Sequence, residues 1–128
     1  MPAVSGESSA GGAMRPVPVD VQVETEVPGV VVCRLAGELD LDTVDGAEAA
    51  LLEALPPGGV LIADLGGIAF FDSTGVNLLL RVRREALERD CEFRVACLSE
   101  RLLRIFEITG VDQILPFYGS LAEARVGG

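Results

Sequence analysis

A serine stands next to a carboxylate at the start of a predicted helix, in the run Asp72-Ser73-Thr74-Gly75. Apolar residues lead up to Phe71, and from Val76 onward they recur at spacings of three and four, which is typical of a helix. A hydroxyl at this position would lie in the positive potential of the helix N-terminus, where anions are favoured. Asp, Ser and Thr also cap helix starts, so a purely structural role for Ser73 is an equally good interpretation. Gly75 has no side chain, which would let another group approach the backbone.

The chain lacks histidine, and all ten of its basic residues are arginine. Ser-His-Asp and Cys-His catalytic sites therefore cannot be built within it. The absence of lysine excludes a Walker A loop, a Schiff base and a Ser-Lys pair. A histidine-dependent zinc site is also excluded. Because most common types of catalytic site are excluded, we expect an interaction protein without metal or cofactor rather than an enzyme.

The 128 residues carry a formal net charge of −10, and 49% of them are hydrophobic. This length predicts one domain, with enough apolar residues for a core. The acidic balance argues against nucleic acid as a partner, since nucleic-acid binding needs a basic surface, and against adhesion to anionic membranes. Residues 1–17 are rich in Gly, Ala, Ser and Pro and lack an apolar signal segment. We therefore expect a disordered tail over 1–17 and a domain over 18–126.

No run of the sequence approaches the length of a membrane span. The three cysteines, at 33, 91 and 97, are odd in number and widely spaced. That pattern predicts reduced, mostly buried thiols, which is typical of a cytoplasmic protein.

Strand and helix patterns alternate through the domain. Predicted strands cover 19–24, 30–35, 60–65, 93–98 and a short edge segment at 114–117, and predicted helices cover 43–55, 74–89, about 99–109 and about 120–124. The turn signal Pro28-Gly29 makes the first two strands an antiparallel hairpin, and the later alternation predicts parallel strands with right-handed crossovers. The fold class is therefore α/β, with a mixed, mostly parallel sheet of four to five strands and about four helices in the order β-β-α-β-α-β-α-β-α.

Two polar stretches follow consecutive strands of the predicted parallel part. Asp40 and Asp42 come just after the second predicted strand, and Asp72-Ser73 follows the third. Sites in such sheets lie beyond the carboxyl ends of the strands. If the two strands are neighbours, we expect their loops to form one acidic patch around one hydroxyl. Asp42 and Thr43 are also placed to cap the first helix.

Three blocks of residues resemble the motif blocks of STAS domains, and more narrowly those of bacterial anti-sigma factor antagonists. They are Gly37-Glu38-Leu39-Asp40, the stretch from Asp64-Leu65 to Phe71-Asp72-Ser73-Thr74-Gly75, and the stretch from Leu102 to Val111. The resemblance covers roughly residues 18–125 in unbroken order, and its most specific part is the Asp-Ser-Thr-Gly block after an apolar strand. It implies a STAS-type fold.

The resemblance also implies a partner switch. The unphosphorylated antagonist binds an anti-sigma factor that is also an ATP-dependent serine kinase, and the sigma factor is released. The kinase phosphorylates the serine after the motif aspartate, which is Ser73 here, and a PP2C-type phosphatase reverses this step. The residues that this resemblance assigns to partner binding are Asp40, Asp42, Asp72, Ser73, Thr74, Gly75 and Asn77.

Other classes of protein fit the residues less well. A two-component receiver needs a lysine near its phosphoacceptor aspartate, and this chain has no lysine. A dimeric aspartic protease needs Asp-Ser-Gly or Asp-Thr-Gly, whereas Thr74 here separates Ser73 from Gly75. A nucleotide-binding STAS module would use the helix N-terminus as an anion site, although no Gly-rich phosphate loop supports it. A STAS subunit of a larger stress-signalling assembly is a further alternative. Calorimetry with ATP and GTP tests the nucleotide-binding module, and particle size on chromatography tests the assembly.

Overall fold

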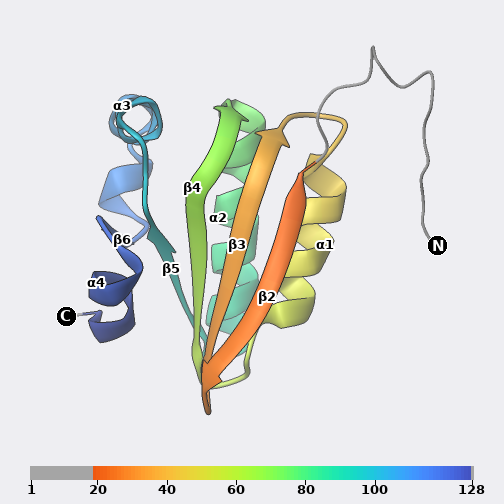
Figure 1. The fold of residues 1–128 in the computed structure, drawn as a ribbon, viewed down its shortest axis with the longest axis vertical. Helices are drawn as coiled ribbons and strands as arrows, with labels where there is room; N and C mark the ends of the chain where they lie inside the picture. Colours follow the sequence, from red (N-terminus) through yellow and green to blue (C-terminus); the bar gives the residue numbers. More distant parts are fainter. Residues whose placement is uncertain (1–18, 128) are drawn as a thin grey trace.

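The computed structural model describes residues 19–127, which form a five-stranded sheet with helices on both faces (Figure 1). The strands are β2 (Asp20–Val27), β3 (Val30–Leu39), β4 (Val60–Phe71), β5 (Glu92–Ala96) and β6 (Phe117–Tyr118). The helices are α1 (Val44–Ala54), α2 (Ser73–Glu88), α3 (Glu100–Thr109) and α4 (Leu121–Val126), with a 3-10 turn, η2 (Val111–Gln113), after α3. The predicted fold class and element order are confirmed, and the predicted tail over 1–17 lies outside the described residues.

The strands lie side by side in the order in which they occur along the chain, β2-β3-β4-β5-β6. β2 and β3 form the predicted antiparallel hairpin, and every later pair is parallel. β3 and β4 pair along their whole length, so that Leu39 lies opposite Phe71 at their carboxyl ends. The next residues of the two strands, Asp40 and Asp72, therefore emerge at the same edge of the sheet.

β4 is longer than the sequence predicts, because it does not end at Leu65. Gly66 and Gly67 continue the strand, and the register with β3 shifts by one residue there and again before Phe70. These shifts are bulges, in which β4 carries an extra residue. A Cβ at Gly67 would press against the carbonyl of Leu35 in β3, so glycine permits the close approach of the two strands. The bulges let β4 reach Phe71, where the polar stretch begins.

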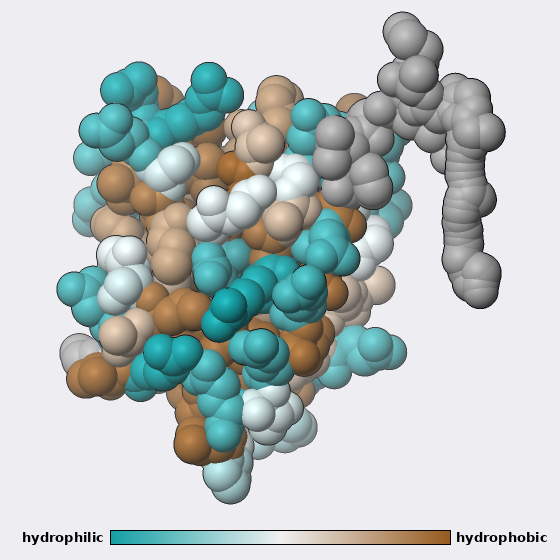
Figure 2. All heavy atoms as spheres, in the orientation of Figure 1, coloured by the Kyte–Doolittle hydropathy of each residue, from teal (hydrophilic) through white to brown (hydrophobic). Residues whose placement is uncertain are grey.

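α1, α2 and α3 cover one face of the sheet, over a core built mainly from Leu, Val and Ile. Alternate residues of β4, such as Leu61, Ala63 and Leu65, point into this core, as the two-residue period of a strand requires. On the opposite face α4 packs on a smaller cluster that includes Ile62 and Ala124. Beyond α4, hydrophilic side chains of β2 and β3 cover that face (Figure 2). A central strand covered on both faces is thus found where α4 packs, at Ile62.

The last two strands differ from the prediction. β5 ends at Ala96, because Cys97 has a φ of 66° and turns the chain out of the extended conformation. The edge strand predicted at 114–117 is mostly the connection after η2, and only Phe117–Tyr118 pairs with β5. The prediction of a short edge strand is confirmed, but the strand lies at Phe117–Tyr118 and not over 114–117.

The three cysteines are free thiols; Cys33 and Cys91 are buried, and Cys97 is half-buried. Burial raises the pKa of the Cys33 thiol to about 11, so this side chain stays protonated at neutral pH. No helix within residues 19–127 is long and apolar enough to cross a membrane.

Candidate functional site

Asp40 fixes the loop between β3 and α1. Its Oδ1 atom accepts hydrogen bonds from the backbone N–H groups of Asp42 and Thr43, at 2.9 and 3.2 Å. The Thr43 hydroxyl donates to the carbonyl of Glu38 at 2.6 Å and accepts from the N–H of Asp40 at 3.1 Å. Thr43 is the N-cap residue of α1, but neither its side chain nor that of Asp42 makes a capping bond. The prediction that Asp42 and Thr43 cap this helix is therefore wrong, because the carboxylate of Asp40 takes the free N–H groups of the loop.

Asp72 caps α2. It has the extended backbone of an N-cap residue, and its Oδ1 atom accepts a hydrogen bond from the N–H of Thr74 at 2.9 Å. Ser73 is the first residue of α2, and it is exposed. Its hydroxyl makes no hydrogen bond to any residue of 19–127. The capping of α2, which is one of the two roles open to Ser73, therefore belongs to its neighbour Asp72.

Two other serines stand at helix starts and are used differently. Ser99 caps α3 by accepting from the N–H of Leu102, and Ser120 caps α4 by accepting from the N–H of Glu123, both at 3.2 Å. Both are N-cap residues, whereas Ser73 lies one position further into its helix. No residue of 19–127 thus occupies the Ser73 hydroxyl, which can react or meet a partner.

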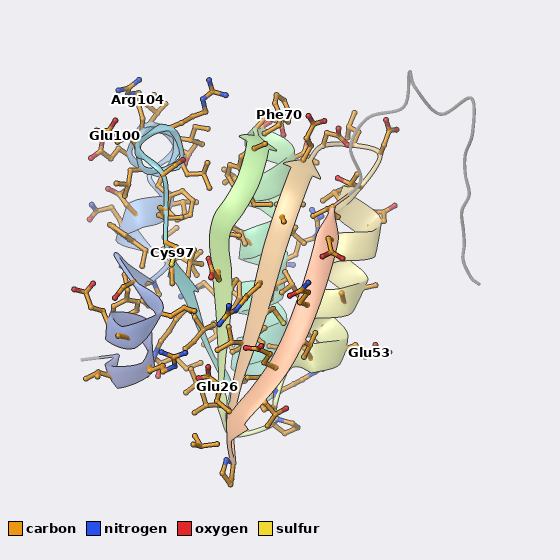
Figure 3. The ribbon with its side chains drawn as sticks, viewed as in Figure 1. Glu26, Glu53, Phe70, Cys97, Glu100 and Arg104 are labelled. Atoms are coloured by element: carbon orange, nitrogen blue, oxygen red, sulfur yellow. The ribbon has the colours of Figure 1, made fainter. Side chains whose placement is uncertain are left out.

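An open depression of about 310 Å³ lies between the loop after β3 and the end of β4. The lining residues are Glu38, Asp40, Leu41, Asp42, Phe70 and Asp72. The β3–β4 register brings them together, since Glu38 lies opposite Phe70, which Figure 3 labels at the end of β4. The structure thus brings the expected carboxylates together, four of them on one concave surface, but the Ser73 hydroxyl is not part of the lining. Within residues 19–127 none of the four has an ion-pair partner, and no group of His, Cys, Asp or Glu is arranged to hold a metal ion.

The other predicted site residues lie in the first turns of α2, which begins directly after Asp72. Ser73 and Asn77 are exposed, and because they are four residues apart they share one face of α2. Thr74 is half-buried and gives its N–H to the cap. Gly75 is buried, and a Cβ there would overlap the ring of Phe71. The group that approaches the Gly75 backbone is therefore a core side chain of the same chain.

Sequence reasoning missed Leu41 and Phe70 as members of the site. Leu41 is a large apolar residue between two aspartates, and 81% of it is exposed. Phe70 precedes the buried Phe71, so the alternation of a strand turns it to the opposite face. The sequence carries a signal for Leu41, an apolar residue in a polar loop, but none for Phe70, because the extension of β4 past its glycines depends on its pairing with β3.

The chain matches the family model described as the STAS domain over residues 22–124. An anti-sigma-B factor antagonist from Listeria monocytogenes is 35% identical to it over 82 residues, which are 63% of this chain and 72% of that protein. Such relatives are named as antagonists of an anti-sigma factor rather than as enzymes.

Solved structures share the fold and support the same family. The chain resembles an anti-sigma factor antagonist from Mycobacterium paratuberculosis with a TM-score of 0.73 and 27% identity, over 84% of this chain and 92% of that one. Against SpoIIAA the TM-score is 0.68 for the unphosphorylated form, at 28% identity over 84% and 96% of the two chains. For the phosphorylated form of the Bacillus protein it is 0.63, at 27% identity over 84% and 97%. Since the family model spans most of the chain and the fold agrees, the chain belongs to the STAS domain family.

Proposed function

We propose that the chain is an anti-sigma factor antagonist whose binding is switched by phosphorylation of Ser73. Unphosphorylated, it binds an anti-sigma factor that is also a serine kinase, and this frees a sigma factor for transcription. Family membership and relatives named as anti-sigma factor antagonists support the role. The observation that carries the choice of Ser73 is its exposed, unbonded hydroxyl beside the capping Asp72.

In the phosphoryl transfer the antagonist supplies only the attacking hydroxyl and its position. The Ser73 oxygen attacks the γ-phosphorus of ATP held by the kinase, the new O–P bond forms as the bond to ADP breaks, and the hydroxyl proton passes to a base of the kinase. Because this chain has no histidine and no lysine, we assign the chemistry to the kinase. The antagonist's part is positioning: the bond from Thr74 to Asp72 holds the first turn of α2, and with it the Ser73 backbone.

A phosphate on Ser73 is compatible with the folded domain. It adds about −1.5 to −2 charge at a helix N-terminus, where the free N–H groups and the helix dipole favour an anion. The Ser73 hydroxyl has no internal hydrogen bond to lose within residues 19–127. SpoIIAA, a structural neighbour in both its unphosphorylated and phosphorylated forms, keeps this fold in each.

At the interface the same charge acts against binding. A kinase that reaches Ser73 holds the phosphates of its nucleotide opposite it, so a phosphoserine meets another anion when the complex forms again. Like charges juxtaposed across an interface cost several kcal/mol, and about 1.4 kcal/mol correspond to a tenfold change in affinity. A loss of two to three orders of magnitude follows from local charge alone. A PP2C-type phosphatase then restores the binding form.

The remaining partner-facing residues of this proposal are Asp40, Asp42, Asp72, Thr74 and Asn77. Gly75 is buried and supports the site by packing on Phe71 rather than by contact with the partner. We place the exchange in the cytoplasm, where the kinase finds its ATP. Residues 1–17 are assigned no part in it, and the domain that binds is 18–126.

Intact-mass spectrometry after incubation with ATP and the candidate anti-sigma factor kinases of the same genome tests the proposal. Wild type and Ser99→Ala are expected to gain one phosphate, and Ser73→Ala none. Ser99 is the matched control, because it is a serine at a helix start whose hydroxyl is already bonded. A phosphate that persists in Ser73→Ala contradicts the site, and a chain that none of these kinases modifies contradicts the switch.

A further inference from the structure

Leu41 is the most exposed large hydrophobic residue within residues 19–127, at 81%. Single exposed leucines are common on protein surfaces and need no explanation. The setting of Leu41 is unusual, since it shares the acidic depression with Phe70, which is 38% exposed, and with four carboxylates. Two apolar side chains surrounded by negative charge form a small, sharply defined surface.

The loop that carries Leu41 is held in one conformation. On one side, Asp40 accepts from the N–H groups of Asp42 and Thr43 through Oδ1, and its carbonyl accepts from the N–H of Val44 at 2.9 Å. On the other, Thr43 joins the loop back to the carbonyl of Glu38. The exposure of Leu41 is therefore built into the fold. A side chain presented in this way costs a partner little ordering entropy on binding.

Within residues 19–127 the chain does not neutralise this surface, and no basic residue of that part lines the depression. The ion pairs within residues 19–127 lie elsewhere, for example Arg34 with Glu24 and Arg81 with Glu48. We therefore expect the complementary charge to come from another molecule, one that also covers the apolar side chain projecting from the surface.

We infer that Leu41 is the apolar anchor and a specificity determinant of the interface with the anti-sigma factor. Its side chain enters an apolar pocket of the partner, and Arg or Lys side chains on the rim of that pocket face the carboxylates of Glu38, Asp40, Asp42 and Asp72. Phe70 forms the floor of the contact. This inference rests on the proposed function, because it takes the anti-sigma factor as the occupant of the depression.

The anchor and the carboxylates differ in their response to salt. Salt screens the attraction between exposed charges, whereas the burial of an apolar side chain does not depend on that attraction. Removing Leu41 should therefore weaken binding by the same factor at low and at high salt. Removing the exposed carboxylate of Asp42 should weaken binding at low salt and much less at high salt.

Isothermal titration calorimetry with the purified anti-sigma factor kinases of the same genome measures this directly. The variants are Leu41→Ser, Asp42→Asn and the matched control Leu87→Ser. Leu87 is a 58% exposed leucine on the C-terminal half of α2, away from the depression. We expect Leu41→Ser to weaken binding about tenfold or more at both salt concentrations, and Leu87→Ser to bind like wild type. The thermal midpoints of both leucine variants should match wild type, because neither side chain belongs to the core.

Three results would decide otherwise. If wild type binds and Leu41→Ser binds equally well, the anchor is refuted while the proposed function stands. If Leu87→Ser weakens binding as much as Leu41→Ser, the effect is general to exposed leucines and the assignment to this depression is refuted. If wild type binds none of the kinases, the proposed function fails, and the inference fails with it.

Discussion

Polar side chains around α4 and those around the start of α2 are used in opposite ways. Near α4, the buried Arg94 donates from Nε to Glu92 at 2.8 Å and from Nη1 to the carbonyl of Ala124 at 2.7 Å. Glu26, at the lower end of β2 in Figure 3, likewise pairs with Arg125 of α4 at 2.6 Å. Around the start of α2 no arginine meets a carboxylate within residues 19–127.

The difference separates groups that hold the fold from groups left for a partner. A buried charge needs partners inside the protein, and Arg94 has them. Asp40 and Asp72 use Oδ1 for backbone N–H groups and leave Oδ2 without a partner within residues 19–127. Ser73, whose hydroxyl has no such bond at all, is the extreme case. We therefore expect substitutions of side chains that are bonded inside the domain to change its stability. Substitutions of side chains that lack such partners should change binding.

The largest expected effect is on binding, from phosphorylation at Ser73. The phosphorylated chain should bind the anti-sigma factor kinase about 100- to 1,000-fold more weakly than the unphosphorylated chain, or about 3–4 kcal/mol. Its thermal midpoint should not fall, because the phosphate is added at an exposed position of a helix N-terminus, which favours an anion. Calorimetric titration and thermal unfolding of the same purified phosphoprotein measure both quantities. A lowered midpoint would mean that the phosphate destabilises the domain. It would contradict the conclusion that Ser73 serves binding and not the fold.

Gly75 is a test of the comparison, because it follows the site residues Asp72 and Ser73 in the chain and yet packs in the core. Gly75→Ala places a Cβ against the ring of Phe71, which is buried and packs on Phe106 with the ring centroids 6.3 Å apart. Overpacking of this kind should lower the free energy of unfolding by about 1–3 kcal/mol. Gly46→Ala in α1 is the control, since a Cβ there meets nothing within 4 Å and should stabilise the helix by about 0.5–1 kcal/mol.

Urea unfolding of the two glycine variants distinguishes packing from contact. Wild-type stability in Gly75→Ala together with lost binding of the anti-sigma factor would give Gly75 a direct place in the interface. It would also show that Phe71 moves aside at little cost.

The sequence was sufficient for the fold class and for the meeting of Asp40 with Asp72, because both follow from local periodicity and from the topology of parallel strands. It was insufficient for the caps. Asp72 and Ser73 are equally able to cap, and the choice depends on which of them has the extended backbone. The same holds at α1, where Asp40 rather than Asp42 takes the free N–H groups.

The rest of the site depends on pairing between distant residues. The bulges at Gly66 and Gly67 arise only when β4 lies against β3, and they decide where β4 ends. That register places Phe70 opposite Glu38, and so beside Leu41. A periodic pattern along one strand contains no information on such a register. The acidic part of the site was therefore predictable, whereas the meeting of Phe70 with Leu41 was not.

A smaller effect is expected from the serines at the helix starts. Ser99→Ala removes the cap of α3 and should lower the free energy of unfolding by about 1 kcal/mol. Ser73→Ala removes a hydroxyl without an internal partner and should change it by less than about 0.5 kcal/mol. Chemical denaturation of the two variants tests the pair side by side. Equal losses would show that Ser73 also supports its helix, which is the role the comparison denies it.

The smallest effect concerns the pH dependence of stability. The hydrogen bond from Arg94 holds the pKa of Glu92 below its ordinary value. A carboxyl with a lowered pKa in the folded state stabilises the protein above its unfolded pKa of about 4.3, and that contribution is lost as the pH falls through the folded value. Glu92→Gln should therefore be less stable than wild type at pH 7, by under about 1 kcal/mol because the Glu92 side chain is half exposed. The gap should close as the pH falls below about 4.3.

Asp42→Asn is the matched control for this experiment, because the Asp42 carboxylate has no bonded partner within residues 19–127. At pH 7 its stability should equal that of wild type, while its affinity for the anti-sigma factor falls at low salt. Urea unfolding at pH 7 gives the comparison. A loss of stability in Asp42→Asn as large as in Glu92→Gln would mean that the carboxylates of the depression also hold the fold, and pairing would no longer separate the two regions.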